Sequence, residues 1–421
     1  MYLTDRSAPA QTGAGAGRIR GRRPGVAPVV LVLGTVSLIT DISSEMVTAV
    51  LPLYLVSTLG FSPLGFGTLD GIYNGVSALV QLTGGHLADR VRGHKLMAGL
   101  GYGLSALCKP LLLLAGSLGT LGTVLALERT GKGLRTAPRD AMISLSTPAA
   151  TQGRAFGVHR AMDTTGAMLG PLTAFLILRA AADGYDAVFG VSTCVAVLGV
   201  LVLVLFVPGR RQSGRTEEAG PPRPKPSVGE ALALLRLPRL RALAGCAALL
   251  GLTTVSDAFV YLLLQRRAGV GDAWFTLLPL GTAVVFLLLA VPMGALADRV
   301  GRRTVFLAGH LALLAAYALL LWAPATPVLA PVVLALHGTF YAATDGVLPA
   351  ALAGVVPEHL RASGLAIVGT SQALARFCCS LAFGAAWTMW GDGAALAGSA
   401  AGLVCCAVVA GLVLRPADGT R

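Results

Sequence analysis

Charged residues are scarce in this sequence. Asp, Glu, Lys and Arg make up 13% of its 421 residues, while 55% are hydrophobic and the mean hydropathy is +0.73. In soluble domains roughly a quarter of the residues are charged. The composition therefore excludes an ordinary soluble domain and predicts a chain whose main solvent is lipid.

Cysteine and histidine are also few, with seven Cys and six His. The cysteines, including the adjacent pairs Cys378-Cys379 and Cys405-Cys406, fall in apolar segments without the spacing of metal ligands. We interpret them as small core hydrophobes. No combination of nucleophile, base and oxyanion-binding groups is apparent, so we predict no metal, no cofactor and no enzymatic activity.

What the sequence does contain is an internal duplication. Gly85-His-Leu-Ala-Asp89-Arg90 and Gly294-Ala-Leu-Ala-Asp298-Arg299 each follow a long apolar stretch, 209 residues apart. Arg154-Ala-Phe-Gly157 recurs as Arg361-Ala-Ser-Gly364 at an offset of 207 residues. Two matches with agreeing offsets indicate two related halves.

The apolar stretches fit membrane-spanning helices. A bilayer core of roughly 30 Å needs about 20 apolar residues per helix. The chain divides into twelve such stretches: 28–57, 63–87, 96–117, 119–135, 155–179, 187–207, 241–266, 273–297, 304–323, 327–351, 362–388 and 393–414. We predict an all-α membrane protein of twelve transmembrane helices in two pseudo-symmetric six-helix bundles.

Lys and Arg concentrate in the N-terminal tail, in the loops after the even-numbered segments and in the stretch 208–241. Because positive residues stay cytoplasmic, we expect both termini and the central linker on the cytoplasmic side of the plasma membrane. Topology and anionic lipid then account for the net charge of +13 without a nucleic-acid partner.

The expected domains follow from these breaks in composition. They are a disordered cytoplasmic tail (1–26), an N-terminal bundle (27–208), a cytoplasmic linker (209–240), a C-terminal bundle (241–415) and a short cytoplasmic tail (416–421).

The second loop motif, Gly294-x-Leu296-Ala297-Asp298-Arg299-x-Gly301-Arg302-Arg303, matches the loop signature of the major facilitator superfamily at every position. The chain resembles this superfamily over residues 28–415. The resemblance implies two rocking bundles and a conformational latch, predicted here at Gly85, Asp89, Arg90, Gly294, Asp298 and Arg299. The first copy departs from the signature by one extra residue before Gly93, and purely topogenic basic loops are the alternative.

The fifth segment carries Gly157, Gly166 and Gly170-Pro171, a spacing similar to the antiporter signature of drug-exporting members. The terminal Gly pair of that signature is replaced by Ala174-Phe175, so the match is partial. Small residues at this spacing favour a close helix crossing, and Pro171 bends the helix. Ordinary packing of an inner helix is the alternative.

Polar residues inside the apolar segments are the candidates for function, because a charge near the bilayer centre costs at least ~2.5–3.5 kcal/mol. Their helical spacing predicts stripes that face one water-filled cavity. These candidates are Asp41, Glu45, Asp70, Asn74, Asp257, Tyr261, His337, Tyr341 and Asp345. For each residue, a satisfied ion pair or a helix-end position is the alternative.

The fourth segment resembles a subgroup of bacterial facilitators with a Gly-Lys-Gly-x-Arg…Arg-Asp signature, and Gly131-Lys132-Gly133 lacks the Ser or Thr of a phosphate loop. Glu128 is spaced to pair with Lys132. We expect Arg135, Arg139 and Asp140 to form cytoplasmic gate ion pairs. Arg129 and Lys132 are expected to contact an anionic substrate group or to balance the carboxylates of the first two helices. Lys109, and Arg160 with Asp163, are expected to form internal pairs.

The favoured function is proton-coupled export of a small organic molecule, such as a drug or secondary metabolite. Glu45 is the predicted proton carrier, because it lies closer to mid-depth than Asp41. Import by proton symport and a non-transporting receptor or assembly factor on the same fold are the alternatives. The expected partners are a small-molecule substrate, the proton gradient and the lipid bilayer, with the chain acting as a monomer.

Overall fold

The computed structural model describes residues 27–90, 94–147, 152–181, 184–208, 233–345, 356–357 and 360–414. Within these ranges only the backbone is described at 77–79, 81–90, 137, 152–153, 361–363 and 365–366. All regular structure in the described residues is helical. The predicted tails and residues 209–232 of the predicted linker lie outside them.

The N-terminal half forms six long helices. They are α1 (Pro28–Leu53), which continues as the π-helix η1 (Tyr54–Thr58), α2 (Pro63–Arg90), α3 (His94–Leu114), α4 (Leu118–Leu145), α5 (Gln152–Ala180) and α6 (Gly184–Phe206).

The C-terminal half is more interrupted. It comprises the 3-10 helix η4 (Leu234–Arg236), α8 (Pro238–Gly251), α9 (Asp257–Ala268), α10 (Asp272–Phe275), α11 (Leu278–Val300), α12 (Arg302–Trp322), α13 (Leu329–Thr344), α15 (Arg361–Trp390) and α16 (Asp392–Val413). Because η4 and the start of α8 fall within 209–240, the predicted linker is too long at its C-terminal end.

The helix predicted over 241–266 is broken. The chain leaves the helix after Gly251 and re-enters it at Asp257. The Thr253 and Thr254 hydroxyls donate to the Leu250 carbonyl, and such local bonds compete with the helical ladder. Tyr317 accepts a hydrogen bond from the freed Val255 N–H at 2.8 Å, so the break is stabilised inside the protein.

The helix predicted over 119–135 is longer than expected and ends at Leu145. The Ser117 side chain accepts from the Thr120 N–H at its start, forming a capping box. Six charged residues follow within α4, and they pair with one another or with acids and bases of neighbouring helices. Arg139, which lies beyond the predicted end of this segment, is therefore a helical residue.

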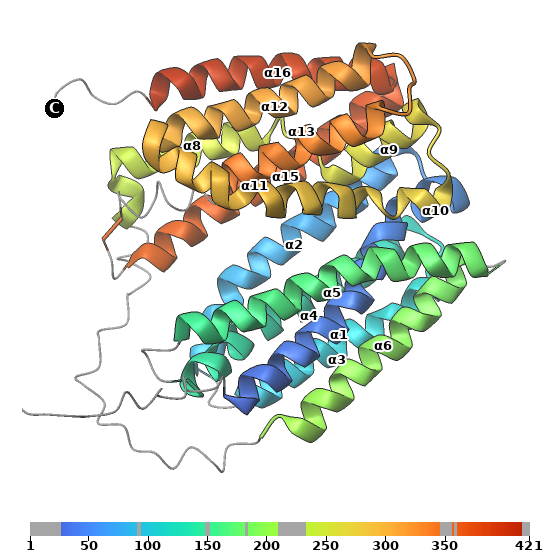
Figure 1. Cartoon of the computed structure of the whole chain (residues 1–421), viewed down its shortest axis with the longest axis vertical. Coiled ribbons are helices and arrows are strands. Elements are labelled where there is room, and N and C mark those ends of the chain that lie inside the picture. Colours follow the sequence, from blue (N-terminus) through green and yellow to red (C-terminus); the bar gives the residue numbers. More distant parts are fainter. Residues whose placement is uncertain are drawn as a thin grey trace, which may run out of the picture.

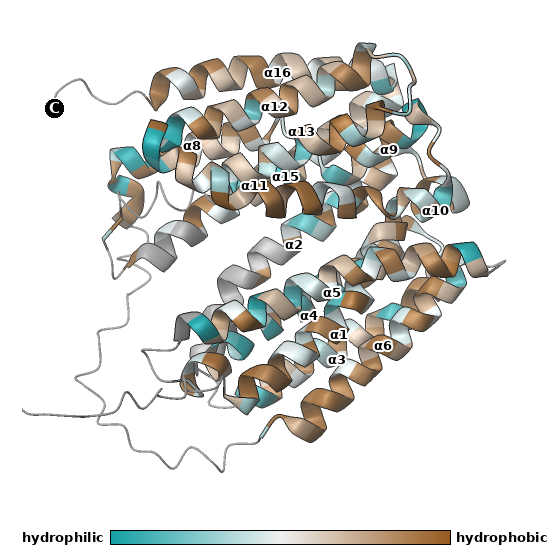
Figure 2. Cartoon of the chain, in the orientation of Figure 1, coloured by the Kyte–Doolittle hydropathy of each residue, from teal (hydrophilic) through white to brown (hydrophobic). Residues whose placement is uncertain are grey.

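Seven helical stretches are long and apolar enough to cross a membrane, judged by length and composition alone. They are Pro28–Thr58, His94–Leu114, Arg154–Ala180, Gly184–Phe206, Asp272–Val300, Arg302–Trp322 and Asp392–Val413. The count of twelve spans stays a prediction. Figure 2 shows mainly hydrophobic residues along α6 and α16. Cys194, Cys378 and Cys405 are exposed on the protein surface, so the interpretation of all cysteines as core residues was wrong.

The helices gather into two bundles, with α2 lying between them (Figure 1). In the first bundle α1 packs on α5 and α6, and α4 packs on α2 and α3. In the second, α13 packs on α11 and α12, and α15 packs on α8 and α16. The largest contact between bundles joins α2 to α15, and a second joins α5 to α10 and α11.

The bundles meet at the end of the molecule where α1 runs into η1, here called the joined end. The Leu64 N–H donates to Thr388 Oγ1 across the α2–α15 contact at 3.0 Å. The rings of Phe175 and Trp274 lie 5.0 Å apart across the α5–α10 contact. Contacts on both sides of the interface thus hold the two bundles together at one end.

Candidate functional site

A cavity of about 350 Å³ lies between the two bundles. Its walls come from α1 and α2 of the first bundle and from α9, α10, α11, α13, α15 and the 252–256 break of the second. The predicted residues that line it are Glu45, Asp70, Asn74, Asp257, Tyr261, Tyr341 and Asp345. Residues from both halves of the sequence therefore share one cavity, whereas the predicted residues Asp41, Glu128, Arg129, Lys132 and His337 are not among those that line it.

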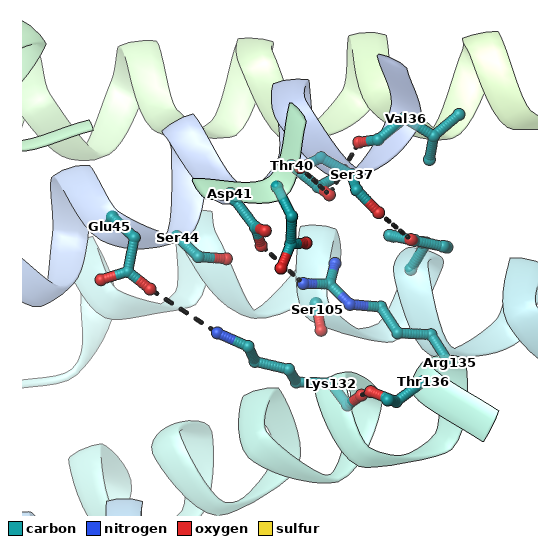
Figure 3. A network of polar contacts seen from close by, with 12 residues as sticks. Val36, Ser37, Thr40, Asp41, Ser44, Glu45, Ser105, Lys132, Arg135 and Thr136 are labelled. Atoms are coloured by element: carbon teal, nitrogen blue, oxygen red, sulfur yellow. Dashed lines mark hydrogen bonds and ion pairs between the residues drawn. The ribbon is translucent and has the colours of Figure 1, made fainter. Parts of the chain in front are cut away.

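Two ion pairs tie α1 to α4 beside the cavity (Figure 3). Lys132 Nζ lies 3.6 Å from Glu45 Oε1, with the side chains 32% and 26% exposed. Arg135 donates to Asp41 Oδ1 at 3.3 Å, and this pair is almost buried. Only Glu45 of the two acids lines the cavity. Lys132 thus balances a carboxylate of the first helix, one of the two roles predicted for it.

A second charge cluster lies deeper in the first bundle. Glu128 Oε2 accepts from Arg129 Nε at 2.6 Å, and Glu128 Oε1 lies 3.4 Å from Lys109 Nζ. The Arg129 guanidinium also stacks 3.6 Å from the ring centroid of Tyr73. The predicted Glu128–Lys132 pair was wrong, because Glu128 points toward α3 while Lys132 reaches α1. Arg129 is 5% exposed and is enclosed by protein groups.

Asp70 lies on α2 at the contact with α15. Its Oδ2 accepts a hydrogen bond from Ser380 at 2.6 Å, and Asn74 donates to its Oδ1 at 3.3 Å. Within the described residues no cation lies within ion-pair distance of Asp70. This carboxylate therefore links the bundles through neutral donors while it faces the cavity.

Asp257 gathers the predicted polar groups of the second bundle. Tyr341 donates to its Oδ1 at 2.5 Å, and His337 Nε2 lies 3.0 Å from the same oxygen. The His337 side chain is fully buried, and its Nδ1 has no partner among the described residues. Tyr261 donates instead to Thr282 at 3.0 Å. Asp257 begins α9 beside the helix break, and Thr253 lies in that break.

Arg376 was missed by the sequence reasoning. It lines the cavity from α15, and its Nε is buried without a hydrogen-bond partner. The rule applied to the acids, that a charge within an apolar segment has a function, identifies Arg376 equally well. Tyr73, Thr282 and Ser380 were also missed, because hydroxyl groups in apolar helices give no comparable signal.

The C-terminal copy of the loop motif forms a tight turn between α11 and α12. Gly301 has a φ of 95°, which favours glycine. Asp298 is 72% exposed and lies 3.6 Å from Arg302 at the start of α12, while Arg299 is exposed. No atom of a neighbouring described helix lies within 4 Å of a Cβ built on Gly294, and the latch stays a prediction. The side chains of Asp89 and Arg90, and the surroundings of Gly85, lie outside the described residues.

The fifth-helix motif lies at the crossing of α1 and α5. A Cβ on Gly166 would meet the Leu38 carbonyl, and one on Gly170 would lie 2.7 Å from Glu45 Cβ. Gly157 has no such neighbour. The predicted close crossing is therefore present at Gly166 and Gly170, next to Pro171 within α5, and it positions Glu45.

Further ion pairs lie near the start of α5. Arg139 Nε donates to Asp140 at 3.0 Å, and Arg139 Nη1 lies 3.6 Å from Asp163. Arg160 lies 3.6 Å from the other Asp163 oxygen, as predicted. In the described residues no group of three or more His, Cys, Asp or Glu side chains is placed to hold a metal ion.

Two helical bundles around a shared polar cavity define the class of membrane transporters that work by moving one bundle against the other. The chain belongs to the Major Facilitator Superfamily, whose family model matches residues 33–376 and 275–421.

Two further proteins are similar to the chain in sequence. An uncharacterized MFS-type transporter of Methanocaldococcus jannaschii is 30% identical over 398 residues, covering 91% of this chain and 94% of that protein. An uncharacterized protein of Mycobacterium tuberculosis is 33% identical over 178 residues, covering 42% and 43%.

Solved structures share the fold. The nucleoside transporter NupG superimposes with a TM-score of 0.75 at 13% identity, covering 92% of this chain and all of NupG. A bacterial homologue of the human lysosomal transporter Spinster, in an inward-facing and unoccupied conformation, gives 0.70 at 16% identity, covering 94% and 95%.

Proposed function

We propose that this chain exports a small organic molecule in exchange for protons, by alternating access of the cavity to the two membrane faces. The carrying observation is the cavity itself, because carboxylates from both bundles line it and the bundles join at one end. Buried carboxylates give a transporter groups that exchange protons as their surroundings change. Membership of the superfamily supports secondary transport, and the partial antiporter motif favours export.

The distribution of positive residues supports an orientation in the plasma membrane with both termini cytoplasmic. The joined end then faces outward, and the cavity is accessible from the cytoplasmic side in this conformation. In a cysteine-free background, Ser62→Cys should react with an impermeant thiol reagent outside intact cells, whereas Ser213→Cys should react only after permeabilisation. Labelling of both from outside would contradict this orientation.

Glu45 is the proposed proton carrier. It faces the cavity, is partly exposed and is paired only loosely with Lys132, at 3.6 Å. A proton on Glu45 neutralises the carboxylate and releases Lys132, so one of the two ion pairs between α1 and α4 depends on protonation. Gly170 of α5 packs against Glu45. Protonation of Glu45 is therefore sensed by α5, which contacts α10 and α11 of the second bundle.

Proteoliposomes with an imposed pH gradient test the proposal. For each member of a metabolite panel, proton antiport predicts accumulation when the lumen is acidic, whereas symport predicts accumulation when the lumen is alkaline. Glu45→Gln should abolish accumulation while retaining exchange of labelled for unlabelled substrate. Accumulation driven by an alkaline lumen would replace export with import, and flux indifferent to both pH gradient and Glu45→Gln would contradict proton coupling.

A further inference from the structure

The cavity contains a positive group without a counterion. Arg376 presents a guanidinium to the cavity from α15, and no ion pair or hydrogen bond holds it within the described residues. Two carboxylates of its bundle, Asp257 and Asp345, interact with Arg376 electrostatically without reaching ion-pair distance, and Asp257 Oδ1 is engaged by His337 and Tyr341. A guanidinium has five N–H donors in a planar fork that matches a carboxylate. Arg376 therefore has free capacity for an anionic group in the cavity.

The cavity also contains a negative group without a counterion. Asp70 receives hydrogen bonds from the neutral side chains of Ser380 and Asn74 and has no ion pair among the described residues. A carboxylate has about four lone-pair positions, so acceptor capacity remains. By contrast, the cavity acid Glu45 already has a cationic partner in Lys132. Asp70 is therefore suited to receive a cation that the protein itself does not supply.

These two groups lie close to each other without pairing. Ser380, which binds Asp70, follows Arg376 by four residues on α15, a separation of about 6 Å along a helix. Phe377 lies between them in sequence and packs on Gly71 and Gly75 of α2, which fixes the register of the two helices. An acid bound to Ser380 and a base one helical turn from Ser380, both bordering one cavity, fit the two charges of one small molecule.

We propose that the cavity binds zwitterionic organic molecules, with the substrate carboxylate on Arg376 and the substrate ammonium on Asp70. This inference rests on the proposed transport function and specifies its substrate class. The remaining walls include Pro52, Phe275, Pro279 and Phe286, which accommodate an apolar substrate body. Because Asp70 belongs to the first bundle and Arg376 to the second, such a substrate bridges both bundles.

A binding panel in detergent tests the assignment. The zwitterionic probes are phenyl-substituted α-, β- and γ-amino acids, which vary the charge separation. 2-Phenylethylamine carries only the ammonium and 3-phenylpropionate only the carboxylate. Calorimetry should show that at least one zwitterion binds about tenfold or more tightly than either singly charged probe. Each lost charge contact should weaken binding by about that factor.

Variants identify the two contacts separately. Arg376→Gln should remove the advantage of the zwitterion over the amine, and Asp70→Asn should remove its advantage over the acid. Arg376→Lys should retain part of the carboxylate preference, because it keeps the charge and loses the fork geometry. Arg179→Gln, at the exposed C-terminal end of α5, removes a positive charge elsewhere and should leave the preference unchanged.

The outcomes separate this inference from the proposed function. Three results would each overturn the inference. The amine could bind as tightly as the zwitterion, the preference for the zwitterion could persist in Arg376→Gln, or no zwitterion could bind. None of these results depends on a pH gradient. Zwitterion binding without gradient-driven accumulation of the bound probe would instead overturn proton-coupled transport and leave the substrate class standing.

Discussion

The inner faces of the two bundles handle charge differently. In the first bundle Asp41, Glu45 and Glu128 each have a cationic partner supplied by α3 or α4. In the second, Asp257 is held by a histidine and a tyrosine, and Arg376 has no ion pair within the described residues. The acids of α1 and α4 are therefore paired in the absence of ligand, whereas Asp70 of α2 and Arg376 of α15 border the cavity without an ion-pair partner among the described residues.

Burial and pairing together separate structural charges from functional ones, and Glu45, which is paired but partly exposed to the cavity, belongs with the functional charges. A buried charge with a nearby counterion chiefly holds helices in place, and removing one partner exposes the full desolvation cost of the other. A charge that lacks a counterion and borders a cavity is costly in the empty protein and gains a partner when a ligand or proton arrives. The following predictions test that separation, in order of expected effect.

Glu128→Gln should have the largest effect on stability. It leaves Lys109 and Arg129 without a carboxylate in a buried position, which costs roughly 3–5 kcal/mol of unfolding free energy. Denaturant unfolding in mixed micelles measures the change. Asp257→Asn is the matched variant in the second bundle and should cost less, because its partners are not obligate cations. Equal losses for the two variants would remove the contrast between the bundles.

Tyr341→Phe tests the hydrogen bond of 2.5 Å to Asp257. Hydrogen bonds to charged groups contribute about 1.5–3 kcal/mol, so the unfolding free energy should fall by that amount. Tyr261→Phe, which loses a bond to the neutral Thr282 hydroxyl, should cost about 0.5–1.5 kcal/mol. A smaller loss for Tyr341→Phe than for Tyr261→Phe would show that Asp257 does not depend on the tyrosine.

Gly170→Ala tests the packing that positions Glu45. The added methyl group would lie 2.7 Å from Glu45 Cβ and should destabilise the protein by about 1–3 kcal/mol through overpacking. Gly157→Ala adds the same group to the same helix where no atom lies within 4 Å, and should change stability by less than ~0.5 kcal/mol. The same thermal-unfolding assay on both proteins makes the comparison, and indistinguishable variants would contradict the close crossing.

Asp298→Asn should have the smallest effect on stability. Its pair with Arg302 is exposed, and such pairs contribute about 0–1 kcal/mol. If the loop motif is a conformational latch, Asp298→Asn and Asp89→Asn should lower the transport rate more than substrate affinity. Unchanged transport rates in both variants would reduce the motif to a topological signal.

Much of the architecture was predictable because it depends on averages over many residues. The length of the apolar segments and the duplicated motif predicted an all-helical protein of two related halves. The helical spacing of the polar residues predicted a shared cavity, and seven of them line it. The break before Asp257 was not predictable, since it depends on Tyr317 from a distant helix. Spacing along α4 suggested Glu128 with Lys132, whereas the packing of α3 and α1 determined the pairs that form.

The charge pattern of the second bundle was harder to predict from the sequence than that of the first. Acids were sought as proton carriers, so Arg376 was passed over although it satisfies the same rule. Its lack of a counterion depends on how His337 and Tyr341 occupy Asp257, which only the three-dimensional arrangement shows.

Cross-linking of the joined end tests alternating access most directly. Leu64 and Thr388 are hydrogen-bonded across the bundles, so Leu64→Cys with Thr388→Cys in a cysteine-free background should form a disulfide under mild oxidation. The cross-linked protein should stop transporting and reduction should restore transport, while each single variant should transport under both conditions. Full transport by completely cross-linked protein would contradict the movement of the two bundles about the cavity.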